Sequence, residues 1–329
     1  MPNYNFEDGR CTFEGAVSVE TGPGWAMPWR LPWPERAFYP VLAGDTAQTP
    51  SGVRLTFVTD ACRIGLRLLE PAEGMKLDLL VDGGLVETRT VAASDSLVQF
   101  NPLPAGLKQI EIWLDPRFPF RLAEVSVEPG AGLARTAPAQ RRWVHYGSSI
   151  SHSKAAGSPS TLWTGLVAQR LNLHLTNLGF SGQCKLDPMI GRLIRDLPAD
   201  FITLKLGINI YSGDLTERTF GPCAIGLIRL IREKHPETPL AVISPIYSPP
   251  REEVKGGSGL SLRELREVLA GIVTAFREHG DRRIHYVDGL RIFGPQDAGH
   301  LPDELHPDAG GQYIIAEQII REVFGKLQA

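Results

Sequence analysis

The stretch that decides the fold reads RRWVHYGSSISHS and spans residues 141–153. It opens with an apolar run at 143–146 that is typical of a buried strand, and it continues into a glycine and two serines. Glycine and serine are common turn residues, so 147–150 alone indicate a loop. A serine at the carboxyl end of a core strand is also where α/β enzymes place a nucleophile. The rest of the chain decides between these two interpretations.

From residue 143 onward, short apolar runs alternate with stretches of helical period. Strands are expected at 143–146, 174–178, 201–207, 240–246 and 284–288. The helix before the last of these strands is marked by Ser261 and Glu264, which form a capping-box pattern, and by Gly280 at its end. Five strands alternating with helices predict a parallel sheet covered by helices on both faces.

Residues 1–128 follow a different period, in which short runs alternate apolar and polar residues. These runs lie at 53–59, 62–69, 76–82, 85–91, 108–114 and 123–128. Turn signals separate them, among them the hairpin signature at 82–84. The pattern predicts an antiparallel sandwich or jelly roll. Residues 1–45, rich in Trp, Pro and Gly, show no assignable period.

The predicted organisation is therefore a β-sandwich domain at 1–128, a linker at 129–142 and an α/β domain at 143–329. The linker is predicted because residues 129–142 lack an apolar period and carry Pro, Gly and Ala.

Composition limits the partners and the compartment. A net charge of −3 without a dense Lys/Arg run argues against nucleic-acid and anionic-membrane partners, since both require a basic patch. The chain shows neither a signal peptide nor an apolar run of about 18 residues, the length a membrane span needs. Cysteines 11, 62, 184 and 223 have no disulfide-framework or metal-ligand spacing. We expect a cytoplasmic protein, with a secreted mature form and the oligomeric state left open.

Four stretches with polar side chains fall at one predicted edge of the parallel sheet. They are Gly147-Ser148-Ser149-Ile150 and the segments 177–183, 206–211 and 303–312. Because the carboxyl ends of parallel strands share an edge, we expect these four stretches to meet.

The residue types in these stretches suit nucleophilic catalysis. A serine hydroxyl needs a base within hydrogen-bond reach and an acid that orients the base. Asp303 and His306, three residues apart, would share one face of a helical turn, so that the carboxylate holds Nδ1–H while Nε2 faces outward. The backbone N–H groups of Ser149 and Gly182 and the side-chain amide of Asn209 can serve as an oxyanion hole.

In type and in order along the chain, these residues resemble the motifs of the SGNH hydrolases, the GDSL-type esterases. That family carries a nucleophilic Ser in a Gly-x-Ser turn, then a Gly, then an Asn in Gly-x-Asn, and finally Asp-x-x-His. The corresponding residues here are Ser149, Gly182, Asn209, Asp303 and His306. The resemblance covers residues 143–325 and is nearest to a subgroup with an N-terminal β-sandwich domain.

The resemblance implies a flavodoxin-like three-layer fold with a five-stranded parallel sheet, a Ser149–His306–Asp303 triad, an oxyanion hole, and neither cofactor nor metal. It further implies a serine esterase that removes short acyl groups, acetyl above all, from a small-molecule or carbohydrate ester through an acyl-enzyme. Two positions depart from the family pattern, because Ser148 and Ile210 stand where the family carries acids. We expect these changes to affect the local loops more than the chemistry.

Three alternatives stay open at this stage. His300, Asp303, His306 and Asp308 are residue types that suit zinc, although their spacing is no standard ligand frame. The protein could instead be a carbohydrate-binding protein with a vestigial hydrolase domain, or an acylhydrolase acting on lipid or thioester substrates. His145 and His152 flank the nucleophile, and we expect both to be packing or rim residues.

Overall fold

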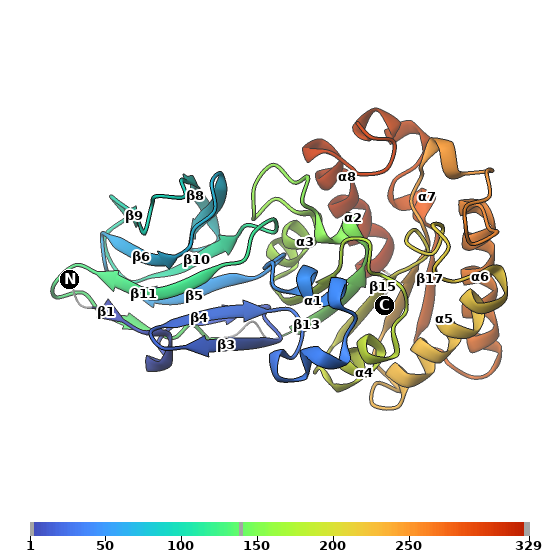
Figure 1. The fold of residues 1–329 in the computed structure, drawn as a ribbon, viewed down its shortest axis with the longest axis horizontal. Coiled ribbons are helices and arrows are strands. Elements are labelled where there is room, and N and C mark those ends of the chain that lie inside the picture. Colours follow the sequence, from blue (N-terminus) through green and yellow to red (C-terminus); the bar gives the residue numbers. More distant parts are fainter. Residues whose placement is uncertain (1–2, 138–140, 326–329) are drawn as a thin grey trace. The chain divides into compact units, whose positions relative to one another are not determined.

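The computed structural model describes residues 3–137 and 141–325 of the chain (Figure 1). The chain divides into two compact units. The strand unit comprises Met1–Ala37, Gly44–Ala139 and Ser158–Ser160. The α/β unit comprises Phe38–Ala43, Gln140–Gly157 and Thr161–Ala329.

The strand unit holds two six-stranded antiparallel sheets. The first has the order β3-β4-β11-β6-β9, and β1 pairs with β11. Its strands are β1 Asn3–Tyr4, β3 Ser18–Gly22, β4 Trp25–Trp29, β6 Ile64–Leu69, β9 Leu97–Phe100 and β11 Arg121–Val127. The second has the order β12-β5-β10-β7-β8, and β2 pairs with β5. Its strands are β2 Thr12–Glu14, β5 Arg54–Thr59, β7 Met75–Val81, β8 Gly84–Val91, β10 Lys108–Leu114 and β12 Leu133–Ala134.

Alternating side chains explain why these strands form a sandwich. Leu55 and Phe57 on β5 and Ile110 and Ile112 on β10 are fully buried in one core that also takes residues from the other sheet. The hairpin of β7 and β8 closes over Asp82 and Gly83, both at positive φ (49° and 80°). That conformation is what the sequence signal predicts for a two-residue hairpin loop.

Two parts of the strand unit differ from the sequence prediction or extend it. Residues 3–45 contain β1 to β4, the 3₁₀ helix η2 Trp33–Phe38 and the start of α1 Val41–Ala47, although Phe38–Ala43 belong to the α/β unit. The linker prediction is corrected, because Leu133 and Ala134 pair with β5 as β12, while residues 138–140 lie outside the described residues. Backbone pairing of two residues requires no apolar alternation, so the sequence pattern could not reveal it.

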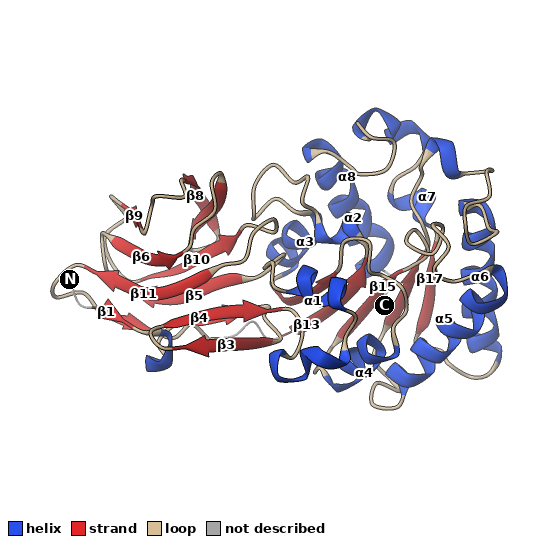
Figure 2. Ribbon diagram, in the orientation of Figure 1, coloured by secondary structure: helices blue, strands red, loops and turns tan. Residues whose placement is uncertain are grey.

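The α/β unit is built on a five-stranded parallel sheet with the order β14-β13-β15-β16-β17 (Figure 2). The strands are β13 Arg141–Gly147, β14 Leu173–Gly179, β15 Phe201–Lys205, β16 Leu240–Ile243 and β17 Ile284–Val287. The first strand along the chain is thus second in the sheet, which is the flavodoxin-like 2-1-3-4-5 order. This confirms the predicted fold class.

Helices lie on both faces of this sheet (Figure 2). They are α2 Ser149–His152, α3 Trp163–Leu171, α4 Pro188–Asp196, α5 Glu217–Arg232, α6 Leu262–Glu278, α7 Gly289–Ile292 and α8 Ala309–Ile319. Helix α3 packs against α8, whereas α5 packs against both α4 and α6. The predicted capping box starts α6, where Ser261 Oγ accepts the N–H of Glu264 at 3.2 Å and Glu264 Oε2 accepts that of Ser261 at 2.8 Å. In the described residues, no helix has the length and apolar character that crossing a bilayer requires.

Candidate active site

The turn after β13 presents Ser149 at the start of the four-residue helix α2. Ser148 precedes it in an extended conformation, and its Oγ accepts the N–H of Ile150 at 3.3 Å. Two glycines pack against this turn, Gly147 at the end of β13 and Gly179 at the end of β14, and neither position has room for a side chain. A Cβ on Gly147 would lie 2.2 Å from Ser151 Oγ, and one on Gly179 would lie 2.5 Å from the Ser151 carbonyl carbon. The two glycines therefore let α2 sit directly against the strand ends.

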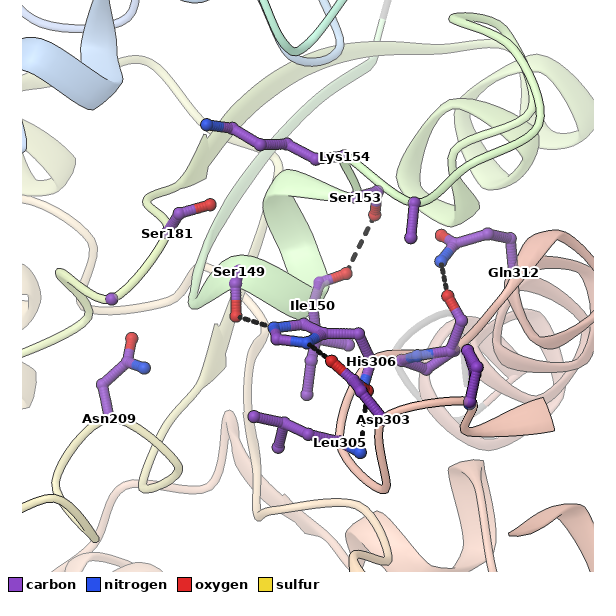
Figure 3. Close-up of a pocket in the computed structure, with 14 residues that line it drawn as sticks. Ser149, Ile150, Ser153, Lys154, Ser181, Asn209, Asp303, Leu305, His306 and Gln312 are labelled. Atoms are coloured by element: carbon purple, nitrogen blue, oxygen red, sulfur yellow. Dashed lines mark hydrogen bonds and ion pairs between the residues drawn. The ribbon is translucent and has the colours of Figure 1, made fainter. Parts of the chain in front are cut away.

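Ser149, His306 and Asp303 form a continuous hydrogen-bonded chain (Figure 3). Ser149 Oγ lies 2.8 Å from His306 Nε2, although 157 positions separate the two residues. His306 Nδ1 lies 2.6 Å from Asp303 Oδ2. The structure thus brings together the three residues that the sequence assigned to a triad.

The route to this geometry differs from the predicted helical turn. Residues 302–306 form an irregular turn in which Glu304 has a φ of 60°, and α8 begins only at Ala309. Asp303 Oδ1 accepts the backbone N–H groups of Leu305 at 3.1 Å and His306 at 2.6 Å. An Asp that bonds its own downstream backbone makes such a turn without a helix.

Asp303 is ionised at neutral pH. Partial burial raises the pKa of its carboxyl, but hydrogen bonds from the His306 ring and backbone outweigh that effect and bring the pKa down to about 2. The carboxylate therefore favours the tautomer with the proton on Nδ1, which leaves Nε2 free to accept the Ser149 proton.

Candidate oxyanion donors lie on the other side of Ser149. Figure 3 shows the Asn209 side chain across Ser149 from His306. Asn209 Oδ1 accepts the N–H of Cys184 at 3.0 Å, so its Nδ2 is the end available to a substrate oxygen. Gly182 lies in the turn after β14 with a φ of 70°. Within the described residues, the N–H groups of Ser149 and Gly182 have no protein acceptor.

A cavity of about 740 Å³ opens over these residues. Ser149, Gly182, Asn209 and His306 all line it. Apolar surface comes from Ile150, Ala155, Pro302, Leu305 and Pro307. The space is large enough for a small ester, with the carbonyl placed between the base and the oxyanion donors.

Comparison with known proteins identifies the family. The profile of the GDSL-like lipase/acylhydrolase family matches residues 140–323, more than half of the chain. The chain belongs to the GDSL-like lipase/acylhydrolase family. A second profile, the N-terminal domain of SsfX3, matches residues 11–122. A search of curated proteins finds no match.

Among solved structures, this GDSL-like family member is similar to the salicylyl-acyltransferase SsfX3 from a tetracycline biosynthetic pathway. The two chains are 36% identical, with a TM-score of 0.92, and the match covers 99% of this chain and 97% of the other. A putative GDSL-like lipase from Bacteroides ovatus is 15% identical, with a TM-score of 0.81 and coverages of 99% and 98%. A family two carbohydrate esterase from Clostridium thermocellum is 15% identical, with a TM-score of 0.69 and coverages of 97% and 99%. At 15% identity, the last two show the shared fold alone.

The residues considered for a metal in this GDSL-like protein separate into two pairs. His306 bonds Asp303, and His300 Nδ1 lies 2.9 Å from Asp308 Oδ1. In residues 3–137 and 141–325, no three His, Cys, Asp or Glu side chains converge in a way that could hold a metal ion.

The two departures from the family pattern have structural roles. Ser148 caps α2 from a fully buried position, and Ile210 is fully buried beyond Asn209. Lys154 and Ser181 also line the cavity, which the sequence analysis missed. Ser181 lies inside the predicted segment 177–183, next to Gly182, and Lys154 directly follows the stretch 141–153, so closeness in the sequence was the available signal.

Proposed function

We propose that the protein cleaves an acyl ester through a covalent acyl-Ser149 intermediate. The observation that carries this proposal is the chain Ser149–His306–Asp303, with distances of 2.8 and 2.6 Å. A serine hydroxyl is a weak nucleophile near neutral pH and reacts when an oriented base removes its proton. The family membership supports acyl chemistry at this site.

In the first half-reaction, Ser149 Oγ attacks the ester carbonyl while its proton passes to His306 Nε2. The carbonyl oxygen becomes an oxyanion held by the N–H groups of Ser149 and Gly182 and by Asn209 Nδ2. His306 then gives the proton to the leaving alcohol as the carbon–oxygen bond breaks. In the second half-reaction, His306 deprotonates the acceptor, which attacks the acyl carbon. The bond between the acyl carbon and Ser149 Oγ then breaks, and His306 returns the proton to Oγ.

For the substrate, we propose a short-chain ester, acetyl above all, of a carbohydrate alcohol, with water as the acyl acceptor. Support comes from the resemblance to the SGNH subgroup with an N-terminal β-sandwich domain and from the family two carbohydrate esterase that shares the fold. A second candidate is transfer of an aromatic acyl group to an alcohol. The full-length 36% identity to a salicylyl-acyltransferase favours it. The candidates share the first half-reaction and differ in the acyl group and its acceptor.

The decisive variant is Ser149→Ala, assayed with p-nitrophenyl acetate. We expect hydrolysis to fall to the level of free solution, with the circular dichroism spectrum unchanged. A serine-directed organophosphate should inactivate the wild type with one adduct on Ser149, and a chelator should have no effect. Activity retained by Ser149→Ala, or inactivation by the chelator alone, would refute the mechanism.

The acyl group and acceptor are separated by a substrate panel. p-Nitrophenyl acetate, butyrate and benzoate, a thioester and an acetylated xylo-oligosaccharide are compared, each with and without an added alcohol. Release of acetate from the oligosaccharide, with no acylated alcohol formed, supports the esterase. Preference for benzoate, with the acyl group recovered on the alcohol, supports the acyltransferase. A wild type inert to every ester that still binds oligosaccharide would instead support the vestigial-enzyme alternative.

A further inference from the structure

The helix that carries the nucleophile is too short to hold its own position. Helix α2 spans four residues, Ser149–His152, whereas isolated helices need roughly 12 residues or more to be even marginally stable. It supplies both Ser149 Oγ and the Ser149 N–H, the proposed nucleophile and one proposed oxyanion donor. A shift of α2 would therefore disturb two parts of the site at once.

A second serine–histidine pair lies directly behind this helix. Ser151 Oγ is 2.7 Å from His145 Nε2, and both residues are fully buried. His145 Nδ1 is 2.7 Å from Thr203 Oγ1, which also accepts the indole N–H of Trp143 at 2.8 Å. A four-member chain of polar side chains thus connects α2 to β13 and to β15.

Two further bonds fasten the backbone of the same helix. The indole N–H of Trp163 donates to the Ile150 carbonyl at 2.9 Å, and Asn177 Nδ2 donates to the Ser151 carbonyl at 2.9 Å. The Trp163 ring also meets the His145 ring edge to face, with centroids 4.9 Å apart. Buried polar networks of this kind fix one arrangement, because any other leaves a donor or acceptor unpaired away from water.

The Ser151–His145 pair does not repeat the chemistry of Ser149 and His306. Burial and, to a smaller extent, the Lys205 charge lower the pKa of His145 to about 3, so its ring stays neutral. Its Nδ1 faces the Thr203 hydroxyl, whereas His306 Nδ1 faces a carboxylate. Ser151 is fully buried and is not among the cavity residues.

We propose that the chain Ser151–His145–Thr203–Trp143 positions the nucleophile. It holds α2 in the one place where Ser149 Oγ meets His306 and the Ser149 N–H faces the substrate oxygen. These four are positioning residues that act through Ser149, and the inference rests on the proposed function. Displacements of about 1 Å in a reacting group can cost on the order of 10²-fold in rate.

Thr203 offers a matched pair of variants to test this. Thr203→Val keeps the shape and removes the hydroxyl, whereas Thr203→Ser keeps the hydroxyl. Ser151→Ala removes the other end of the chain. The concentration of active sites is measured by organophosphate titration, and kcat for p-nitrophenyl acetate is expressed per titrated site. We expect this kcat to fall about 10- to 100-fold in Thr203→Val and Ser151→Ala. KM should stay within about twofold, and Thr203→Ser should remain within about threefold of wild type in kcat.

A structural role alone would lower the melting temperature and the titrated fraction while leaving kcat per titrated site unchanged, and that result would overturn the proposal. Equal losses in Thr203→Ser and Thr203→Val would overturn it too. Should Thr203→Val fail to fold, Ser151→Ala carries the test by itself. Ser149→Ala is assayed in parallel: if it stays active the proposed function fails, whereas an inactive Ser149→Ala beside an unimpaired Ser151→Ala refutes only the positioning role.

Discussion

At the scale of single residues, Asp303 has two roles in the site, one toward the backbone of its own turn and one toward the His306 ring. Its two oxygens divide their work: Oδ1 accepts two backbone N–H groups and shapes the turn, while Oδ2 faces the imidazole. One carboxylate therefore both builds the turn and orients the base. This dual role is why Asp303 and His306 stay together without a helix between them.

We predict that Asp303→Asn lowers kcat/KM for p-nitrophenyl acetate by about 10³- to 10⁴-fold while preserving the fold. The amide can still accept the backbone N–H bonds, but it can present an N–H to the ring and favour the wrong tautomer. Steady-state kinetics and circular dichroism check this. A loss smaller than about tenfold would show that His306 does not need the carboxylate.

At the scale of elements, Gly179 at the end of β14 makes room for α2. We predict that Gly179→Ala pushes the Ser151 backbone away and lowers both kcat and the melting temperature, because the added Cβ would lie 2.5 Å from the Ser151 carbonyl carbon. Gly226, exposed within α5, is the matched control, since nothing lies within 4 Å of its Cβ position. There alanine should stabilise the protein by about 0.5–1 kcal/mol and leave kcat unchanged. Unchanged kcat in Gly179→Ala would mean that α2 tolerates displacement.

Many of the strands, and the residues of the candidate triad, could be predicted from the sequence. Periodicity predicted the five parallel strands and six of the twelve sandwich strands in the described residues, and motif order brought Ser149, Asp303 and His306 together. It missed β4 Trp25–Trp29, whose WAMPW sequence contains a proline and does not alternate. It also missed the bond from Ser151 to His145, because that pairing depends on how a strand, a turn and a short helix fold back on one another. The predicted cytoplasmic location and the predicted lack of nucleic-acid and membrane partners stay predictions.

At the scale of the whole molecule, each unit has a core of its own, and the α/β core encloses an unusual cation. Lys205, at the end of β15, is almost fully buried. Burial, assisted by the charge of Arg266, lowers the pKa of its ammonium group to about 8, although Cys184 acts in the opposite direction. Between pH 8 and the ordinary value of 10.5, the unfolded chain therefore binds more protons than the folded one. The free energy of unfolding should rise with pH across that window through this group.

We predict that Lys205→Met stabilises the protein at pH 7 by about 1–3 kcal/mol, because it removes a cation that is costly to bury. Urea unfolding at pH 7 and 9.5 tests this prediction. The wild type should gain stability at the higher pH relative to the variant, which lacks the titrating group. A variant less stable than wild type at pH 7 would show that the buried ammonium group has compensating partners.

The two ends of the triad also set an order of events during synthesis. The nucleophile follows the first strand of the parallel sheet, and the base comes after the last strand, which ends at Val287. A nascent chain therefore carries the Ser149 hydroxyl and the proposed oxyanion donors well before it carries His306. Under the proposed mechanism, a chain that lacks the segment ahead of α8 has no base for Ser149, and we expect it to be inactive toward esters.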